Sequence, residues 1–181
     1  MSLLSDVVAA LEQEDIAHAL IGAAAMALHG VSRATADVDL FTVDRKALQA
    51  RLWTELEQKG ATLRLIKGDF DDPLAGSIRL SLSGDRTVDV VVGKHTWQTD
   101  VIDSAEPISL GEVSVRVARP AGLVLLKLYA GGPKDAWDIQ SLLESHEQAD
   151  DIKAEVEGSL SRLPSECKEL WKRILEGRQT S

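Results

Sequence analysis

The sequence is poor in cysteine, in aromatic residues and in positive charge. A single cysteine, Cys167, excludes an intrachain disulfide and fits a reducing compartment such as the cytoplasm. Aromatic residues make up only 4% of the chain, so no base-stacking surface for single-stranded nucleic acid is indicated. The net charge of −9 argues against broad, non-specific nucleic-acid binding. A nucleotide substrate stays compatible with this charge, because cations can bridge carboxylates and phosphates.

The sequence also lacks long apolar runs and a targeting segment. The N-terminal stretch MSLLSDVVAALEQEDIAH has no cationic start and is interrupted by acids, so it is not a signal peptide. No apolar run approaches the roughly 20 residues that a bilayer-spanning helix needs. We therefore expect a cytoplasmic protein with no membrane partner. Hydrophobic residues, at 44% of 181, are sufficient for a folded core.

The order of the predicted elements indicates an α/β (α+β) chain that becomes purely helical towards its end. Helical spacing and caps predict helices at residues 2–14, 23–30, 45–59 and 95–105. Apolar alternation predicts strands at residues 16–22, 36–43, 61–67, 77–84 and 86–93, and two short strands within 107–118. Beyond Pro120 only helical patterns occur. A boundary near residue 119 thus separates an α/β core, residues 1–119, from a helical part, residues 120–181, that we expect to pack on it.

Two aspartates, Asp37 and Asp39, alternate with apolar residues in the predicted strand 36–43. Because side chains alternate along a strand, both carboxylates point to one face. Two adjacent ionised carboxylates repel each other, and a hard divalent cation such as Mg²⁺ removes the conflict. A third acid, Asp89, lies in a similar apolar strand. The alternative is a solvated strand end at which the aspartates bind nothing.

Three carboxylates on neighbouring strands are typical of a site for phosphoryl or nucleotidyl transfer. Gly22 and Ala23 precede a helix of small residues, whose free N–H groups could bind phosphate. The alternative for this pair is an ordinary strand-to-helix turn. A further acidic segment, residues 69–72, lacks an apolar strand context and indicates a solvated loop.

The order and spacing of these segments resemble a known signature. Gly22-Ala23, the strand Asp37-Val38-Asp39-Leu40 and the later Val88-Asp89-Val90 are similar to the motifs of the DNA polymerase β-like nucleotidyltransferase superfamily. The run with His29-Gly30, Arg33 and Thr35 resembles the AbiEii-like abortive-infection toxin branch in particular. The segment KLYAGGPKDAWDI, residues 127–139, is similar to a Lys-bearing helix and a following basic-Asp-x-x-Asp segment of that branch.

The resemblance implies a nucleotidyltransferase fold, with a mixed β-sheet flanked by helices. It implies that the enzyme transfers NMP from an NTP to a hydroxyl of an RNA, such as a tRNA, or of a protein. It also implies a toxin–antitoxin context with an antitoxin partner. The implied metal is Mg²⁺ or Mn²⁺, and the implied catalytic ligands are Asp37, Asp39 and Asp89. The residues implied at the nucleotide are Gly22, Ala23, Arg33, Lys127 and Lys134, with Asp135 and Asp138 as further candidates.

The sequence departs from this family pattern at three places. Ala23 stands where Gly or Ser is usual, Lys134 replaces an arginine, and Gly131-Gly132 occupy positions where basic residues are common. These departures favour an alternative, a catalytically degenerate binding module that acts through a protein partner or a bound nucleotide. Two of the candidate residues at the nucleotide have simpler alternative roles. Lys127 could extend out of a packed helix into solvent, and Asp135 could interact favourably with a helix dipole.

Overall fold

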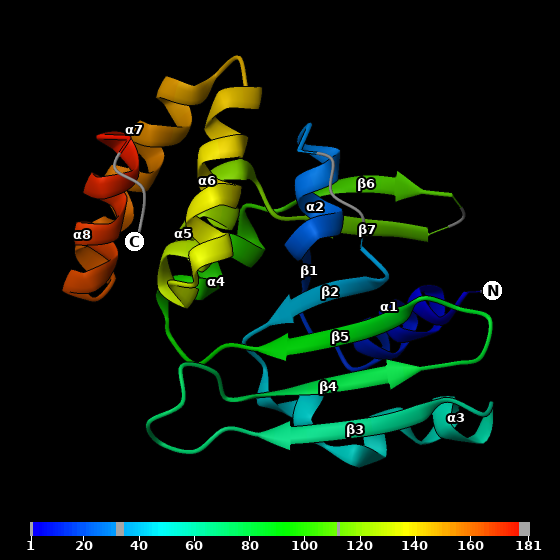
Figure 1. Cartoon of the computed structure of the whole chain (residues 1–181). Helices are drawn as coiled ribbons and strands as arrows, with labels where there is room; N and C mark the ends of the chain where they lie inside the picture. Colours follow the sequence, from blue (N-terminus) through cyan, green and yellow to red (C-terminus); the bar gives the residue numbers. More distant parts are fainter. Residues whose placement is uncertain (1, 32–34, 112, 178–181) are drawn as a thin grey trace. The chain divides into compact units, whose positions relative to one another are not determined.

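Alternating apolar residues in the first two thirds of the chain form one mixed β-sheet in the computed structural model (Figure 1). The structure describes residues 2–31, 35–111 and 113–177. It divides into two units. The sheet unit comprises Met1–Ala25 and Ala34–Ala118, and the helical unit comprises Met26–Arg33 and Arg119–Ser181.

Within the described residues, the sheet has seven strands in the order β3-β4-β5-β2-β1-β7-β6. The strands are β1 Ala19–Ile21, β2 Asp37–Thr42, β3 Thr62–Lys67, β4 Gly76–Ser81, β5 Thr87–Val92, β6 Glu106–Leu110 and β7 Val113–Val117. The pairs β2–β5 and β1–β7 are parallel, and the other neighbouring pairs are antiparallel. The α/β fold with a mixed sheet, predicted from the sequence, is thereby confirmed.

One face of β2, β4 and β5 forms the core of the sheet unit. The inward residues of these strands, which include Val38, Leu80 and Val90, are almost completely buried. Helix α1 (Leu3–Gln13) and the segment η1 (Arg45–Leu48), η2 (Ala50–Trp53) and α3 (Thr54–Gln58) lie on that side, behind the strands as seen in Figure 1. Because side chains alternate, the polar residues of the same strands lie on the opposite face.

The single helix predicted over residues 45–59 is wrong. Asp44 does cap the segment, since its carboxylate accepts a hydrogen bond from the backbone N–H of Lys46 at 2.8 Å. The chain becomes extended at Gln49, with φ −91° and ψ 118°, and separates two short 3₁₀ turns. This break allows both Ala47 and Trp53 to be fully buried, and the Trp53 indole donates to the carbonyl of Ala47 at 2.9 Å. Tertiary burial therefore overrides the local helical pattern.

Helix α2 (Gly22–Leu28) follows β1 directly, and α4 (Trp97–Asp103) follows β5. The helical unit is built around α5 (Pro120–Ala130). Its other helices are α6 Pro133–Ser145, α7 Ala149–Ser159, η3 Leu160–Arg162 and α8 Ser165–Leu175. Helices α6, α7 and α8 pack on α5, which buries Leu123, Val124 and Leu128 among them. In the described part of the chain, no helix is long and apolar enough to cross a bilayer.

Candidate functional site

Asp37 and Asp39 project from β2 on the face opposite the core, as their alternation with buried Val38 and Leu40 predicts. Strand β5 runs parallel to β2 in a register that pairs Asp39 with Asp89. The third acid thus lies on the neighbouring strand at the same height and on the same face. We call Asp37, Asp39 and Asp89 the acidic site.

One arginine, Arg79 on β4, binds two members of the acidic site. Its Nε donates to Oδ1 of Asp89 at 2.9 Å, and its Nη2 donates to Oδ2 of Asp89 at 2.7 Å and to Oδ2 of Asp37 at 2.8 Å. The register pairs Arg79 with Asp89 across β4 and β5, which places the guanidinium over the acids. The hydrogen bonds to Asp89 first, and then the charges of Asp89 and Asp37, raise the pKa of Arg79 above its usual value.

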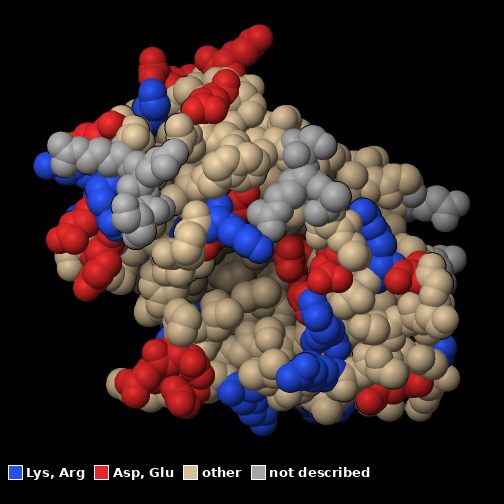
Figure 2. All heavy atoms as spheres, in the orientation of Figure 1, with Lys and Arg blue, Asp and Glu red and all other residues tan. Residues whose placement is uncertain are grey.

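The acidic site lies on an open face of the sheet. The side chain of Asp37 is 39% exposed, that of Asp89 17% and that of Arg79 50%. In Figure 2, basic side chains gather over β4 and β5 beside acidic ones. Two cavities of the sheet unit, about 350 and 300 Å³, are lined by residues of other elements and contain no member of the acidic site.

Gly22 begins helix α2 directly beside Asp39. Its neighbour Ile21 pairs with Asp39 in the antiparallel register of β1 and β2. The backbone of Gly22 has φ +65°, and a Cβ atom added to it would stand 2.8 Å from Cγ of Asp39 and closer still to Oδ2. Only glycine meets both conditions, because other residues avoid positive φ and real Cβ atoms do not approach so closely. Gly22 thus provides the space that the Asp39 carboxylate occupies.

The donor set of the acidic site suits a hard divalent cation. Carboxylate oxygens are preferred ligands of Mg²⁺, and oxygens of Asp37 and Asp89 already converge on one cationic nitrogen of Arg79. Among the residues that the structure describes, no group of three or more His, Cys, Asp or Glu side chains is arranged to hold a metal ion. In the present arrangement, Asp37 and Asp89 are bound to the guanidinium instead.

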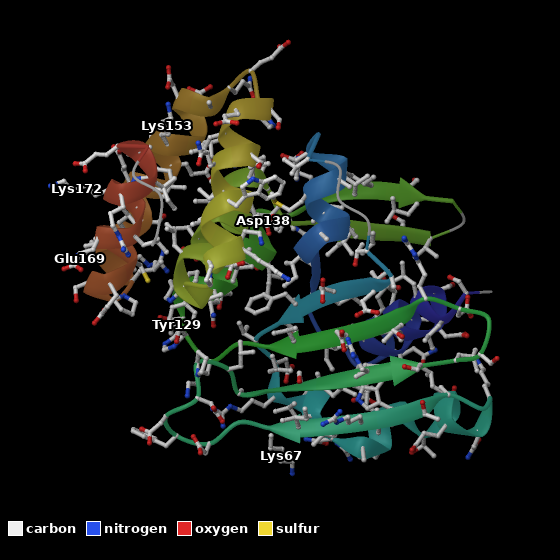
Figure 3. The ribbon with its side chains drawn as sticks, in the orientation of Figure 1. Lys67, Tyr129, Asp138, Lys153, Glu169 and Lys172 are labelled. Atoms are coloured by element: carbon white, nitrogen blue, oxygen red, sulfur yellow. The ribbon has the colours of Figure 1, made fainter. Side chains whose placement is uncertain are left out.

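A second polar cluster lies within the helical unit. Lys127 on α5 does not extend into solvent: its side chain is only 15% exposed, and its Nζ lies 2.5 Å from Oδ2 of Asp138 and 3.1 Å from Oδ1 of Asp135. Figure 3 shows Asp138 on α6, where its side chain is 5% exposed. Asp135 also accepts a hydrogen bond from the backbone N–H of Gly132 at 3.0 Å and so caps α6. The structure brings these three predicted residues together.

The remaining predicted residues differ in their surroundings. Lys134 is exposed on the first turn of α6, and Ala23 is half-buried in the first turn of α2. Arg33 lies outside the described residues. The prediction that Arg33 and Lys134 contact a nucleotide stays a prediction.

Arg79 is the site residue that the sequence analysis missed, although a signal for it was present. The strands predicted over residues 77–84 and 86–93 meet at Gly84-Asp85, and this short connection predicts a hairpin. A hairpin pairs residues that are equally distant from its turn. Arg79 and Asp89 are equally distant from Gly84, and the structure pairs them. The hairpin pattern thus predicts the pairing of Arg79 with Asp89. The contact of Arg79 with Asp37 follows only from the pairing of β2 with β5.

A strand that bears two aspartates, a parallel neighbour that bears a third, and a glycine at the adjoining helix start are features of the nucleotidyltransferase fold. A family model described as "Nucleotidyl transferase AbiEii toxin, Type IV TA system" matches residues 2–162, and the chain belongs to this family. The family resemblance predicted from the sequence is thereby confirmed. No curated protein matches the chain.

Two solved structures of an antibiotic-resistance factor share the fold of this chain. The solution structure of the antibiotic-resistance factor ANT(2'')-Ia matches 97% of this chain and 96% of its own, with a TM-score of 0.52 and 16% identity. The crystal structure of ANT(2'')-Ia in complex with adenylyl-2''-tobramycin matches 88% of this chain and 96% of its own, with a TM-score of 0.53 and 15% identity. At such identities the likeness concerns the fold alone.

Proposed function

We propose that this nucleotidyltransferase transfers NMP from an NTP to a hydroxyl of an RNA, for instance a tRNA, or of a protein, and that it does so as the toxin of a toxin–antitoxin pair in the cytoplasm. The observation that carries the proposal is the convergence of the acidic site. Asp37 and Asp89 bind one cationic centre, and Asp39 lies beside Asp89 in the β2–β5 register. The family of the chain supports the toxin role.

In the proposed reaction, the acceptor oxygen attacks the α-phosphorus, the bond to the β-phosphate oxygen breaks, and pyrophosphate leaves. Asp89, the acid next to Asp39, accepts the proton of the acceptor hydroxyl or completes the set of metal ligands. Asp37 and Asp39 would hold Mg²⁺ or Mn²⁺, which neutralises charge on the phosphates. Gly22 and Ala23 would lie against the triphosphate, and Lys127, Arg33 and Lys134 would contact phosphate.

A second candidate function is a binding module that has lost turnover. The salt bridges of Arg79 favour it, because they neutralise two of the three acids without a metal. Ala23, which offers no hydroxyl to a phosphate, favours it as well. This module would bind a nucleotide or a partner protein without transferring NMP. The two candidates differ in one measurable event, the formation of a covalent product.

Incubation of the protein with Mg²⁺, each NTP labelled at the α-phosphate, and total RNA tests the proposal. We expect a labelled band on RNA or protein with one NTP, and no band when the label is at the γ-phosphate. Asp39→Asn should abolish labelling, because it removes a charge from the acidic site. Asp71→Asn is the matched control, since it makes the same change in an exposed loop. The same two variants, compared for growth on expression, test the toxin role.

Two results would contradict the proposed enzyme. If no NTP yields a labelled product while Mg²⁺ and NTP together still raise the melting temperature of the protein, the binding module is the better description. Labelling that Asp39→Asn leaves unchanged would place the reaction elsewhere in the chain.

A further inference from the structure

We propose that Arg79 is a resident counter-ion of the acidic site, which holds Asp37 and Asp89 before a divalent metal binds and has to release them when the metal enters. This inference deepens the proposed function and rests on it, because it concerns how the same carboxylates receive their metal. The proposal follows from the contacts of one side chain with two acids on two other strands.

The contacts of Arg79 use the same oxygen atoms that a metal would use. Both carboxylate oxygens of Asp89 accept a hydrogen bond from the guanidinium, and Nη2 is shared with Oδ2 of Asp37. Bidentate contacts between arginine and carboxylate are among the stronger charge-assisted hydrogen bonds. A Mg²⁺ ion would approach such oxygens to about 2.1 Å. A guanidinium and a metal ion therefore cannot occupy the space between Asp37 and Asp89 at once.

The sheet register keeps Arg79 at this place. Arg79 is paired with Asp89 on one side and with Arg64 of β3 on the other. All three residues point to the open face, where Arg64 is exposed. In the described part of the chain, Arg64 makes no ion pair with the acids. The fold thus places two arginines on one face, of which only Arg79 binds the acidic site.

This arrangement has a consequence for metal affinity. If a metal ion binds only after Arg79 has left, it binds only to those molecules in which the carboxylates of Asp37 and Asp89 are released. The apparent metal affinity is reduced in proportion to the fraction of such molecules. In the metal-free protein, Arg79 relieves the repulsion between the acids and holds β2, β4 and β5 together. Removal of Arg79 should thus tighten metal binding and destabilise the metal-free protein at the same time.

The proposal is tested by the affinity of the full chain for Mn²⁺, which requires no turnover. The affinity is measured by calorimetric titration and by electron paramagnetic resonance of the free Mn²⁺ ion. For Arg79→Gln we expect Mn²⁺ affinity about tenfold tighter than wild type, from the release argument, together with a lower melting temperature without metal. Arg64→Gln is the matched control: it removes the same charge from the same face, and we expect a change of less than about twofold.

Arg79→Lys supplies a second variant should Arg79→Gln not fold. An ammonium keeps the charge but cannot make the bidentate contact, so we expect tightening of about threefold. Equal affinities in wild type, Arg79→Gln and Arg79→Lys would overturn the proposal and leave the proposed function standing. Equal tightening in Arg64→Gln and Arg79→Gln would also overturn it, since general charge would then explain the effect. Absence of Mn²⁺ binding in all four proteins would overturn both this proposal and the metal-dependent function.

Discussion

Replacement of Gly22 by alanine tests whether the backbone at the start of α2 builds the acidic site. The substitution has two separate effects. It places a side chain on a backbone with φ +65°, which costs a residue other than glycine roughly 1–2 kcal/mol. It also drives the new methyl group into the carboxylate of Asp39, 2.8 Å from its Cγ.

Gly111→Ala separates these two effects. Gly111 has φ +63°, and an added Cβ would meet no atom within 4 Å, so this variant carries the backbone cost alone. Steric overpacking adds typically about 1–3 kcal/mol. We therefore expect a loss of unfolding free energy of about 2–5 kcal/mol in Gly22→Ala, against about 1–2 kcal/mol in Gly111→Ala. Because Asp39 has to turn away from its place, nucleotidyl transfer should fall about 100-fold in Gly22→Ala only.

Urea unfolding of the two variants and the labelled-NTP assay measure these quantities. Equal losses of stability in both variants, with wild-type labelling by Gly22→Ala, would refute the reasoning. Such a result would mean that the carboxylate of Asp39 does not depend on the space that Gly22 leaves.

Two further predictions concern the helical unit. Asp138→Asn should lower the free energy of unfolding by about 3 kcal/mol, because it leaves the largely buried Lys127 with one carboxylate fewer. Asp135→Asn changes a more exposed carboxylate and should lower it by about 1 kcal/mol. Urea unfolding measures both losses, and a larger loss in Asp135→Asn than in Asp138→Asn would contradict this prediction. Burial, followed by the charge of Glu166, raises the pKa of the Cys167 thiol, so the thiol stays protonated in the folded chain at a pH at which the unfolded chain releases its proton. The free energy of unfolding should therefore fall as the pH rises above the ordinary pKa of a thiol. A thiol reagent should also label the folded protein much more slowly than the urea-unfolded protein. Rapid labelling of the folded protein would contradict the burial of Cys167.

The polar cluster around Lys127 illustrates how far sequence patterns reach. The resemblance brought Lys127, Asp135 and Asp138 together as candidates, and the structure joins them by two salt bridges. The spacing of Asp135 and Asp138 on one helix is local, and their shared face was predictable. The contact with Lys127 depends on the turn at Gly131, which has φ +68° and lets α6 pack back on α5. No helical periodicity specifies that packing.

The broken segment after Asp44 illustrates the opposite case. Its composition and its cap favour one helix, and the cap is present. The helix does not form as one piece, because Ala47 and Trp53 both become buried in the sheet unit. Burial of a tryptophan contributes several kcal/mol, more than the helix propensity of a few residues.

The sequence by itself determined which residues share a face. The two-residue period of a strand turns Asp37 and Asp39 to the same side, and the same period buries Val38, because these relations involve only neighbours in the chain. The tertiary structure alone decided which faces meet. The parallel pairing of β2 with β5 sets Asp39 beside Asp89, and the same pairing brings Asp37 within reach of Arg79, the hairpin partner of Asp89. Outside such hairpins, strand order and register depend on contacts between residues far apart in sequence, which no local pattern encodes.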